Sequence, residues 1–170
     1  MFWESSMFTR AAFCLLAFTT MAQADIGLPN AQPLGSASFR WLGVTFYDAT
    51  LYTQQNRQFS WQNPMALELR YRKGVSGQKL AGSAGIEIRR LEGKPADYSQ
   101  FMSKLERCFR DVRKGDRYVA VSPSVNRIQM SLNGKRTCTV DHPDVRQRFL
   151  GIWLSPNSRM PSLSRRLRGE

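Results

Sequence analysis

The chain has 170 residues and a formal charge of +12 at neutral pH, with 25 lysine and arginine residues against 13 acidic ones. This length is that of one ordinary domain with a sizeable core, and it requires no second domain. A basic protein is attracted to polyanions, but beyond Arg10 its cations are spread along the chain from Arg40 to Arg168, with a cluster only at residues 165–168. Most of them are therefore expected to be solvated surface rather than a dedicated anion site.

Residues 1–24 have the pattern of a cleavable secretory signal peptide. A short segment ending at Arg10 is followed by an uncharged run at residues 11–21, and this run leads into Ala22-Gln23-Ala24, a small-x-small cleavage site. The run is too short to span a bilayer as a helix, which takes ~20 residues. Cleavage near Ala24 is therefore expected, and no transmembrane segment is expected in the mature chain. An uncleaved anchor and a misassigned start codon are the alternatives.

Export determines which partners the chain is expected to meet. Cleavage would place the mature protein in the periplasm or outside the cell. The polyanions there are lipid headgroups, lipopolysaccharide and wall polymers, so a weak attraction to anionic envelope surfaces is expected. Nucleic acid is not an expected partner.

The first half of the mature chain predicts three strands. Residues 25–33 contain two prolines and show no periodicity, which suits a flexible lead-in before a domain at residues 34–170. Two strands are expected between Gly35 and Tyr52, followed by a polar loop at residues 54–64. In the third, residues 65–72, apolar residues alternate with mostly polar ones, which is typical of an antiparallel sheet with one buried face and one wet face.

Helical spacing follows the third strand. Apolar residues recur every three or four positions from Leu80 to Leu91 behind a Ser76-Gly77 start, and again from Tyr98 to Phe109. Asp97 is the expected cap of the second helix. Three further strands are then expected at residues 118–122, 127–132 and 136–140.

The Asn133-Gly134 pair indicates a hairpin between the last two strands. A two-residue loop would place threonines of the last strand beside Ile128 and Met130. An odd loop, made by a type I turn with a glycine bulge, would place Cys138 and Val140 there instead. We prefer the second pairing because it buries apolar groups.

The chain is expected to end in two helices. The first begins within residues 141–144 and ends at Ser155-Pro156, and the second is a short basic helix at residues 161–167. His142, the only histidine, is expected to cap the first of them, because one histidine without a cysteine cluster does not supply a zinc site. Strands in two antiparallel groups with helices after each predict an α+β fold whose sheet is covered on one face.

Two cysteines, Cys108 and Cys138, remain in the mature chain, and both are expected to face the core. In an oxidising compartment an even pair favours a disulfide, which would close a loop of ~30 residues and contribute ~3 kcal/mol. Two separate buried thiols are the alternative, and the sequence leaves both open.

Asp48 interrupts the otherwise uncharged run VTFYDATLY. A carboxylate held among aromatic side chains would have a raised pKa and would be able to act as an acid or bind the polar head of a ligand. The alternative, which we favour, is a structural carboxylate at a bulge or strand end with its oxygens bonded to the backbone.

Several short segments occur in a fixed order: GV at 43–44, FYDATLY at 46–52, ALEL with a following tyrosine at 66–71, GD at 115–116, NG at 133–134 and FLGIWL at 149–154. In order and spacing they resemble the exported bacterial branch of the chalcone isomerase-like proteins, over nearly all of the mature chain. The resemblance implies an open-faced β-sandwich, an antiparallel sheet of about six strands with helices layered on one face.

The wider family contains plant enzymes that close a flavanone ring and non-catalytic relatives that bind fatty acids. The resemblance places Gly35 at the position of the catalytic arginine and Tyr47 at that of a threonine. Leu80 replaces the active-site tyrosine and Glu87 an asparagine, while only Ser158, near a second hydroxyl, keeps its chemistry. An arginine that stabilises the oxyanion is the main electrostatic requirement of that reaction, so its loss argues against it.

The expected function is therefore non-catalytic binding of a small hydrophobic or amphipathic ligand, such as a fatty acid, between sheet and helices. No catalytic residue, cofactor or metal is assigned. An isomerase or intramolecular lyase on another substrate, with Asp48 or Glu87 as general base, is one alternative. An interaction module that docks on anionic envelope surfaces is another. The candidate pocket residues are Tyr47, Asp48, Leu80, Glu87, Trp153 and Ser158.

Overall fold

The computed structural model describes residues 26–55 and 58–170, so the expected signal peptide at residues 1–24 lies outside the described residues. The elements in chain order are β1 (Ala31–Trp41), β2 (Val44–Gln54), β3 (Met65–Tyr71), α1 (Gly77–Glu92), α2 (Tyr98–Glu106), β4 (Arg117–Ser124), β5 (Arg127–Leu132), β6 (Lys135–Asp141), α3 (Val145–Leu154) and α4 (Pro161–Leu167).

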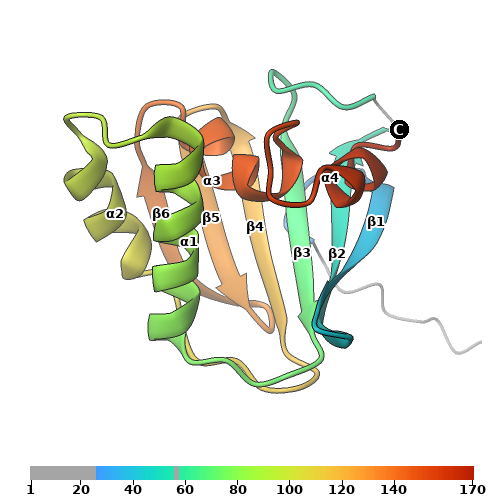
Figure 1. Cartoon of the computed structure of the whole chain (residues 1–170). Helices are drawn as coiled ribbons and strands as arrows, with labels where there is room; N and C mark the ends of the chain where they lie inside the picture. The colour runs from blue at the N-terminus through green and yellow to red at the C-terminus, as the bar shows by residue number, and fades with distance from the viewer. Residues whose placement is uncertain (1–25, 56–57) are drawn as a thin grey trace, which may run out of the picture.

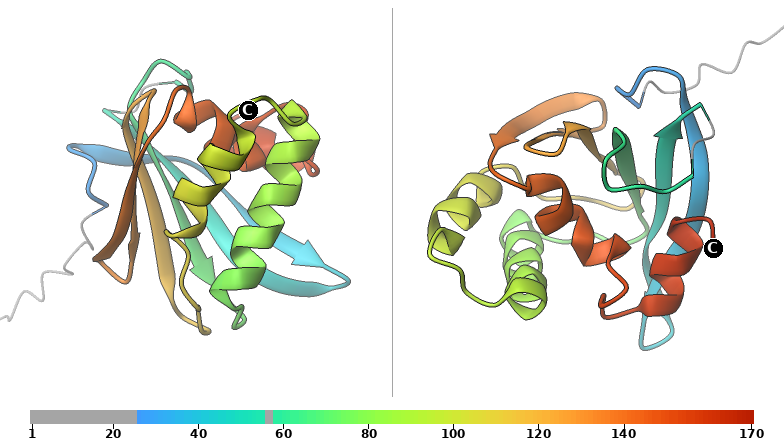
Figure 2. Two further views of the ribbon diagram at one scale, coloured as in Figure 1. Left: turned by 90° about the vertical axis from the view of Figure 1, so that its left-hand side faces the viewer. Right: turned by 90° about the horizontal axis from the view of Figure 1, so that it is seen from above.

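Within the described residues, six strands form a single antiparallel sheet in which each strand pairs with its neighbour in sequence. The helices all lie on one side of this sheet, as the two views of Figure 2 show. The predicted α+β fold, with helices layered on one face of an antiparallel sheet, is confirmed. The sheet curves strongly, so that the end of the β1–β2 hairpin lies on the helix side (Figure 2).

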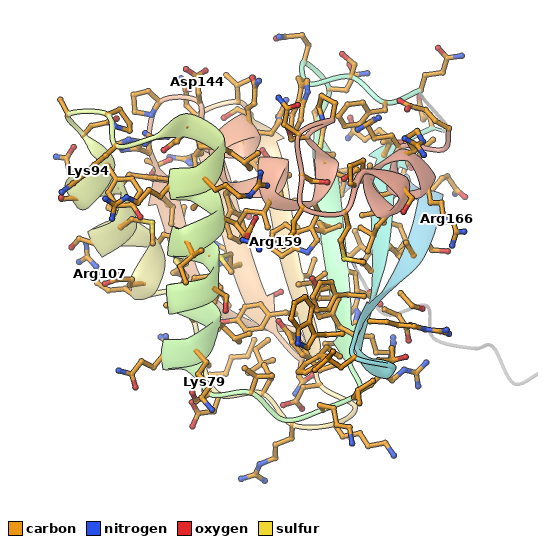
Figure 3. The ribbon with its side chains drawn as sticks, in the orientation of Figure 1. Lys79, Lys94, Arg107, Asp144, Arg159 and Arg166 are labelled. Atoms are coloured by element: carbon orange, nitrogen blue, oxygen red, sulfur yellow. A yellow bond between two sulfur atoms is a disulfide. The ribbon has the colours of Figure 1, made fainter. Side chains whose placement is uncertain are left out.

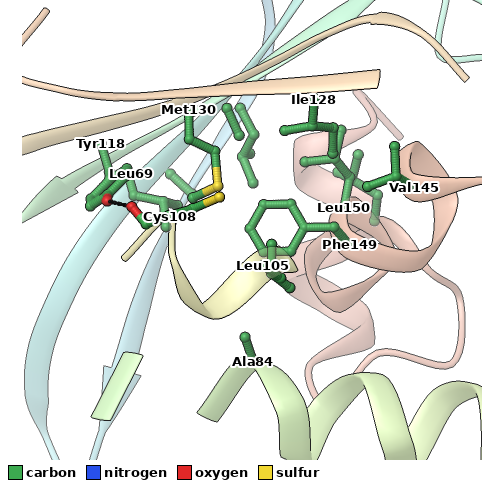
Figure 4. Close-up of a cluster of buried hydrophobic side chains, with 14 of the residues drawn as sticks. Leu69, Ala84, Leu105, Cys108, Tyr118, Ile128, Met130, Val145, Phe149 and Leu150 are labelled. Carbon is green, nitrogen blue, oxygen red and sulfur yellow. Dashed lines mark hydrogen bonds between the residues drawn. The ribbon is translucent and has the colours of Figure 1, made fainter. Parts of the chain in front are cut away.

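The main core fills the space between the sheet and the helices. Tyr71 of β3 and Met130 of β5 point into it and are 4% and 2% exposed. Figure 4 shows Met130 facing Phe149 of α3 and Leu105 of α2 across this layer. Burying these apolar side chains is the main source of the stability of such a layered fold.

The sheet face opposite the helices is less exposed to solvent than expected. Ala66, Val119 and Val121 form a second apolar cluster there with Ile26 and Leu28, which are both buried. Residues 25–33 were expected to be a flexible lead-in, but residues 26–30 cover this cluster and residues 31–33 already belong to β1. Gly27, at a φ of +74°, turns the chain so that the apolar residues on each side of it reach the sheet.

The predicted helix start at Ser76-Gly77 is confirmed. The hydroxyl of Ser76 accepts a hydrogen bond from the backbone N–H of Lys79 at the start of α1. Asp97 is the N-cap residue of α2, as predicted, but its side chain makes no capping hydrogen bond. Its carboxylate instead accepts hydrogen bonds from His142 at 2.8 Å and Arg148 at 2.9 Å. These two side chains, one of them a fixed cation, are stronger partners than a backbone N–H.

The predicted capping role of His142 is wrong. Helix α3 begins at Val145 rather than within residues 141–144, and the residue before it is Asp144, at a φ of +53°. His142 is buried instead, with its ring stacked on Phe101 at 4.9 Å between centroids. The histidine therefore joins β6 to α2 as part of the core.

The preferred register of the β5–β6 hairpin is confirmed, since Ile128 pairs with Val140 and Met130 with Cys138. The predicted type of loop is wrong. Asn133 and Gly134, at φ values of +50° and +81°, form a two-residue turn of the primed kind. The extra residue is Thr137, which bulges within β6 and shifts the register after the turn.

Cys108, just after α2, and Cys138 in β6 form a disulfide, with their Cα atoms 5.0 Å apart. The bond joins the helix layer to the sheet at a sequence separation of 30 residues. Of the two alternatives that the sequence left open, the structure has the bonded pair.

Candidate functional site

A cavity of about 530 Å³ lies between the sheet and the helices. Its floor is formed by β1 to β5, and its walls by α1, α3 and the segment that leads into α4. Most of the lining is aromatic or aliphatic, with Phe39, Leu67, Leu69, Leu80, Ala84 and Phe149 among the residues that contribute. An apolar space of this size, with few polar groups, has the usual form of a small-molecule site.

Five of the six sequence-predicted pocket residues line this cavity: Tyr47, Leu80, Glu87, Trp153 and Ser158. They come from β2, α1, α3 and the turn after α3, so the fold brings together positions more than 100 residues apart in the sequence. The sixth residue, Asp48, does not line it.

Asp48 faces the other side of the sheet because side chains alternate along a strand and Tyr47 faces the helices. Its two carboxylate oxygens accept hydrogen bonds from Ser38 and Arg72, each at 2.6 Å. The hydrogen bond from Ser38, with a further contribution from Arg72, holds the pKa of Asp48 below its usual value. Asp48 therefore does not have the raised pKa of a functional carboxylate and has a structural role, as we favoured, although its partners are side chains rather than the backbone.

Tyr47 lies deep in the cavity, with its ring stacked on Phe39 at 5.0 Å. Its hydroxyl accepts a hydrogen bond from the indole N–H of Trp153 at 3.0 Å. Burial raises the pKa of Tyr47 to about 12, against an opposing effect of this hydrogen bond and with a smaller contribution from the charge of Glu87. The phenol is therefore neutral at physiological pH, and its own proton has no acceptor among the described residues.

Tyr71 provides a second phenol in the same cavity, with its ring 5.7 Å from that of Tyr47. The residue is 4% exposed, yet its hydroxyl makes no hydrogen bond to any described residue. Burial is also the main cause of the raised pKa of Tyr71. By contrast Tyr118, a third tyrosine of the lining, donates to the backbone carbonyl of Cys108, as the dashed line in Figure 4 marks.

Sequence reasoning placed Tyr71 on the buried face of its strand but did not identify it as a functional residue. Alternation predicts that a side chain is buried. It does not predict whether a buried hydroxyl finds a partner, because that depends on which segments pack above it.

The mouth of the cavity lies between the β1–β2 hairpin and α1. Trp41 at the end of β1 and Ile86 on α1 both line the cavity and are both largely exposed, at 57% and 63%. The cationic side chains of the lining, Lys79 and Arg159, come from α1 and from the segment before α4, and Figure 3 shows them along α1. Arg159 is paired with Glu87, whereas Lys79 forms no ion pair with the described residues, so the uncompensated charge of the lining is that of Lys79.

Glu87 at this mouth is held by two arginines. Arg159 donates to one carboxylate oxygen at 2.7 Å and Arg90 to the other at 2.9 Å. Burial raises the pKa of Glu87, but these two hydrogen bonds outweigh it and hold the pKa below its usual value. A carboxylate stabilised in this way is a weak base.

Ser158 is buried and its hydroxyl is already in use. It forms a 2.5 Å hydrogen bond with the hydroxyl of Ser164, which in turn donates to the backbone carbonyl of Trp153. This chain of hydrogen bonds ties the turn after α3 to α4. Ser158 therefore shapes the cavity wall more directly than it offers a group to a ligand.

Gly35 lies where α4 crosses β1. A Cβ atom on this residue would lie 2.0 Å from the backbone oxygen of Arg166, so the backbone of α4 occupies the space that a side chain would need. The position that the resemblance assigned to the catalytic arginine therefore has no room for one.

Among residues 26–55 and 58–170, no helix is long and apolar enough to cross a membrane. Nor does the part of the chain that the structure describes contain a group of three histidine, cysteine, aspartate or glutamate side chains placed to hold a metal ion.

The fold and the cavity define an open-faced β-sandwich, in which an antiparallel sheet and one layer of helices enclose an apolar space. The family model described as chalcone isomerase-like matches residues 34–169, and the chain belongs to this family. An uncharacterised protein of Haemophilus influenzae is 26% identical over 144 residues, which cover 82% of this chain and 68% of that protein. The crystal structure of a fatty-acid binding protein of Arabidopsis thaliana superposes with a TM-score of 0.61 at 10% identity, covering 83% of this chain and 88% of that one.

Proposed function

We propose that this protein is an exported binding protein that holds one small hydrophobic or amphipathic molecule, such as a fatty acid, in the cavity. The observation that carries the proposal is a mainly apolar cavity of about 530 Å³ whose lining includes Tyr71, a tyrosine whose hydroxyl makes no hydrogen bond to the described residues. Sites for small molecules have volumes of roughly 300–1,000 Å³, and they combine apolar walls with a few polar groups that fix the orientation of the ligand.

The polar groups favour a ligand that accepts hydrogen bonds. The hydroxyl of Tyr71 lies in the lining with its proton unused by the described residues, and a carbonyl or carboxyl group of a ligand would accept a hydrogen bond from it, worth about 0.5–1.5 kcal/mol and more for a charged acceptor. Tyr47 offers a second proton close by, because its hydroxyl oxygen already accepts from Trp153. The raised pKa values of both phenols keep these protons in place at neutral pH.

The charged side chains of the lining favour a ligand that also carries an anionic or polar group. Lys79 lines the cavity without an ion pair to the described residues, and Arg159 lines it while paired with Glu87. An amphipathic molecule with an apolar chain fits this arrangement of an apolar interior with one uncompensated cation in its lining. The Arabidopsis thaliana protein of the same fold is described as binding fatty acids, which makes a fatty acid the first ligand to test.

The proposed location is the periplasm or the outside of the cell, after cleavage near Ala24, as in the exported bacterial branch of the family. The signal-like pattern of residues 1–24 supports it. The Cys108–Cys138 disulfide is a second and independent support, because such bonds persist mainly in oxidising compartments.

Catalysis as an isomerase or lyase has less support than binding. Asp48, one of the two carboxylates considered as general base, lies on the opposite face of the sheet from the cavity. Glu87, the other, is neutralised by Arg90 and Arg159, and both ion pairs would have to rearrange before it accepted a proton.

The test uses protein exported in a bacterial host, stripped of lipid by organic extraction, and titrated with palmitic acid under native mass spectrometry. We expect a single bound molecule per chain. Tyr71→Phe is expected to weaken binding about tenfold, the effect of one lost hydrogen bond, while leaving stability unchanged or slightly higher.

Tyr118→Phe is the matched control, because the hydroxyl that it removes already donates to Cys108 and is not free for a ligand. It should lower stability and leave affinity close to that of the unaltered protein. The proposal is wrong if palmitic acid does not bind, or if the two variants weaken binding equally.

A further inference from the structure

The turn between β1 and β2 presents apolar side chains to solvent. Trp41, Leu42 and Val44 are 57%, 87% and 41% exposed. Leu42 also has a φ of +48°, and Gly43 follows at +77°. This left-handed backbone is unfavourable for a residue such as leucine and is normally taken by asparagine, aspartate or glycine.

The same sheet contains a matched comparison. The β5–β6 turn has nearly the same backbone, with φ values of +50° and +81°, and its residues are Asn133 and Gly134, the pair that this turn favours. Leu42 therefore occupies a position where a polar residue would be more stable, and it gains no packing there. An outlier of this kind indicates a function for the exposed side chain.

The end of the sheet that carries this turn is strongly basic. The register places the segments 72–76, 111–117 and 133–136 at the same end as the β1–β2 turn, at the bottom of Figure 1. Four exposed lysines at this end form no ion pair with the described residues: Lys73, Lys79, Lys114 and Lys135.

The acidic residues of the same end offset only part of these charges. Asp48 is paired with Arg72, while Asp111 and Asp116 accept hydrogen bonds from uncharged groups and keep their negative charge. The four lysines, with Arg113 and Arg136, outnumber these two carboxylates, so the exposed apolar turn is surrounded by more positive than negative charge.

We propose that this end of the molecule docks on an anionic lipid bilayer, with Trp41, Leu42 and Val44 inserted among the lipid headgroups. Tryptophan and leucine flanked by lysines is the combination that favours the interface of an anionic membrane. Three apolar side chains on one short turn are too small a patch for a stable protein–protein interface, which buries at least ~1,000 Å². A bilayer requires no such area, because each side chain inserts separately.

Docking in this way would place the mouth of the cavity at the membrane, since Trp41 belongs both to the turn and to the lining. A ligand would then pass between the bilayer and the cavity with little exposure to water. The docking itself does not depend on the proposed ligand, and it is tested without one.

The test measures the partitioning of the exported protein onto vesicles of phosphatidylcholine with and without phosphatidylglycerol, by sedimentation and by tryptophan fluorescence. We expect binding only to the anionic vesicles, a loss of binding at high salt, and a blue shift from Trp41. Leu42→Asn should lower the partition coefficient about tenfold by removing one apolar side chain from the interface.

The same substitution should preserve or raise thermal stability, because asparagine accepts the left-handed backbone better than leucine. Reduced binding by Leu42→Asn therefore cannot be attributed to misfolding. Lys79→Gln should weaken binding several-fold, while its control Lys94→Gln, near the other end of the helix layer in Figure 3, should not. The proposal fails if the protein does not bind anionic vesicles, or if the Leu42→Asn variant binds them as well as the unaltered chain does.

Discussion

The indole N–H of Trp153 donates to the hydroxyl of Tyr47 over 3.0 Å, and this hydrogen bond crosses the cavity from α3 to β2. It fixes the rotamers of two large aromatic side chains in the lining. It also leaves the proton of Tyr47 free, because the oxygen is the acceptor. One contact thus shapes the cavity and determines which kind of polar group a ligand can bring to it.

Replacing Trp153 by phenylalanine tests this relationship. The variant is expected to lose about 1 kcal/mol of unfolding free energy with the hydrogen bond, which chemical denaturation would measure. The pKa of Tyr47 should rise further, because the hydrogen bond from Trp153 is the contribution that lowers it. An ultraviolet titration of tyrosinate that shows an unchanged or lower pKa would contradict the assignment.

Two glycines provide a matched pair for the packing of α4 on β1. Gly35→Ala should lower the unfolding free energy by 2 kcal/mol or more, roughly the cost of overpacking, because the new Cβ would meet the backbone of α4 at 2.0 Å. Gly82→Ala, on the exposed face of α1 with nothing within 4 Å of the added atom, should raise it by up to ~1 kcal/mol through helix propensity. Equal effects of the two substitutions, measured by urea denaturation, would show that the close approach at Gly35 is not real.

The disulfide should make a large contribution to stability. Replacing both Cys108 and Cys138 by alanine is expected to cost about 3 kcal/mol, through the freedom that the unfolded chain regains. Dithiothreitol should lower the melting temperature of the unaltered protein and leave that of the double variant where it is. An unaltered protein that is insensitive to the reductant even when unfolded would argue against the bond.

The ion pair of Asp48 predicts a loss of stability in acid. The pKa of this carboxyl is lowered in the folded state relative to its usual 3.8, first by Ser38 and then by Arg72. A lowered folded pKa contributes stability that is present above the unfolded pKa and is lost as the pH falls through the folded one. Melting temperatures measured from pH 7 down to pH 3 should therefore fall less steeply for Asp48→Asn than for the unaltered protein, and parallel curves would be inconsistent with this linkage.

The fold followed from the sequence because each element had a clear period. The two-residue alternation at residues 65–72 and the apolar stripe from Tyr98 to Phe109 each predicted one element with one buried face. The pairing of Met130 with Cys138 was predictable for the same reason, since only one register buries both. The errors arose where a polar side chain had a choice of partners, as at Asp97 and His142.

The site was predictable in part. Tyr47 and Trp153 were candidates from the resemblance, and the cavity includes both. Asp48 was wrongly included among the pocket residues because it is the one charged residue in an apolar run. Side chains alternate along a strand, so the neighbour of Tyr47 faces the opposite side of the sheet. Tyr71 was missed because the lack of a hydrogen-bond partner is a property of the packed structure. Leu42 was missed because leucine does not predict a left-handed backbone.

The central claim is that the cavity holds a ligand, and native mass spectrometry of protein taken from its export compartment without any extraction tests it most directly. The unaltered chain should carry a bound molecule of discrete mass, whereas Ala84→Trp, which fills the cavity from α1, should carry none while keeping its folded charge-state distribution. An unaltered protein that is empty under these conditions, or a filled variant that retains the same molecule, would contradict the account.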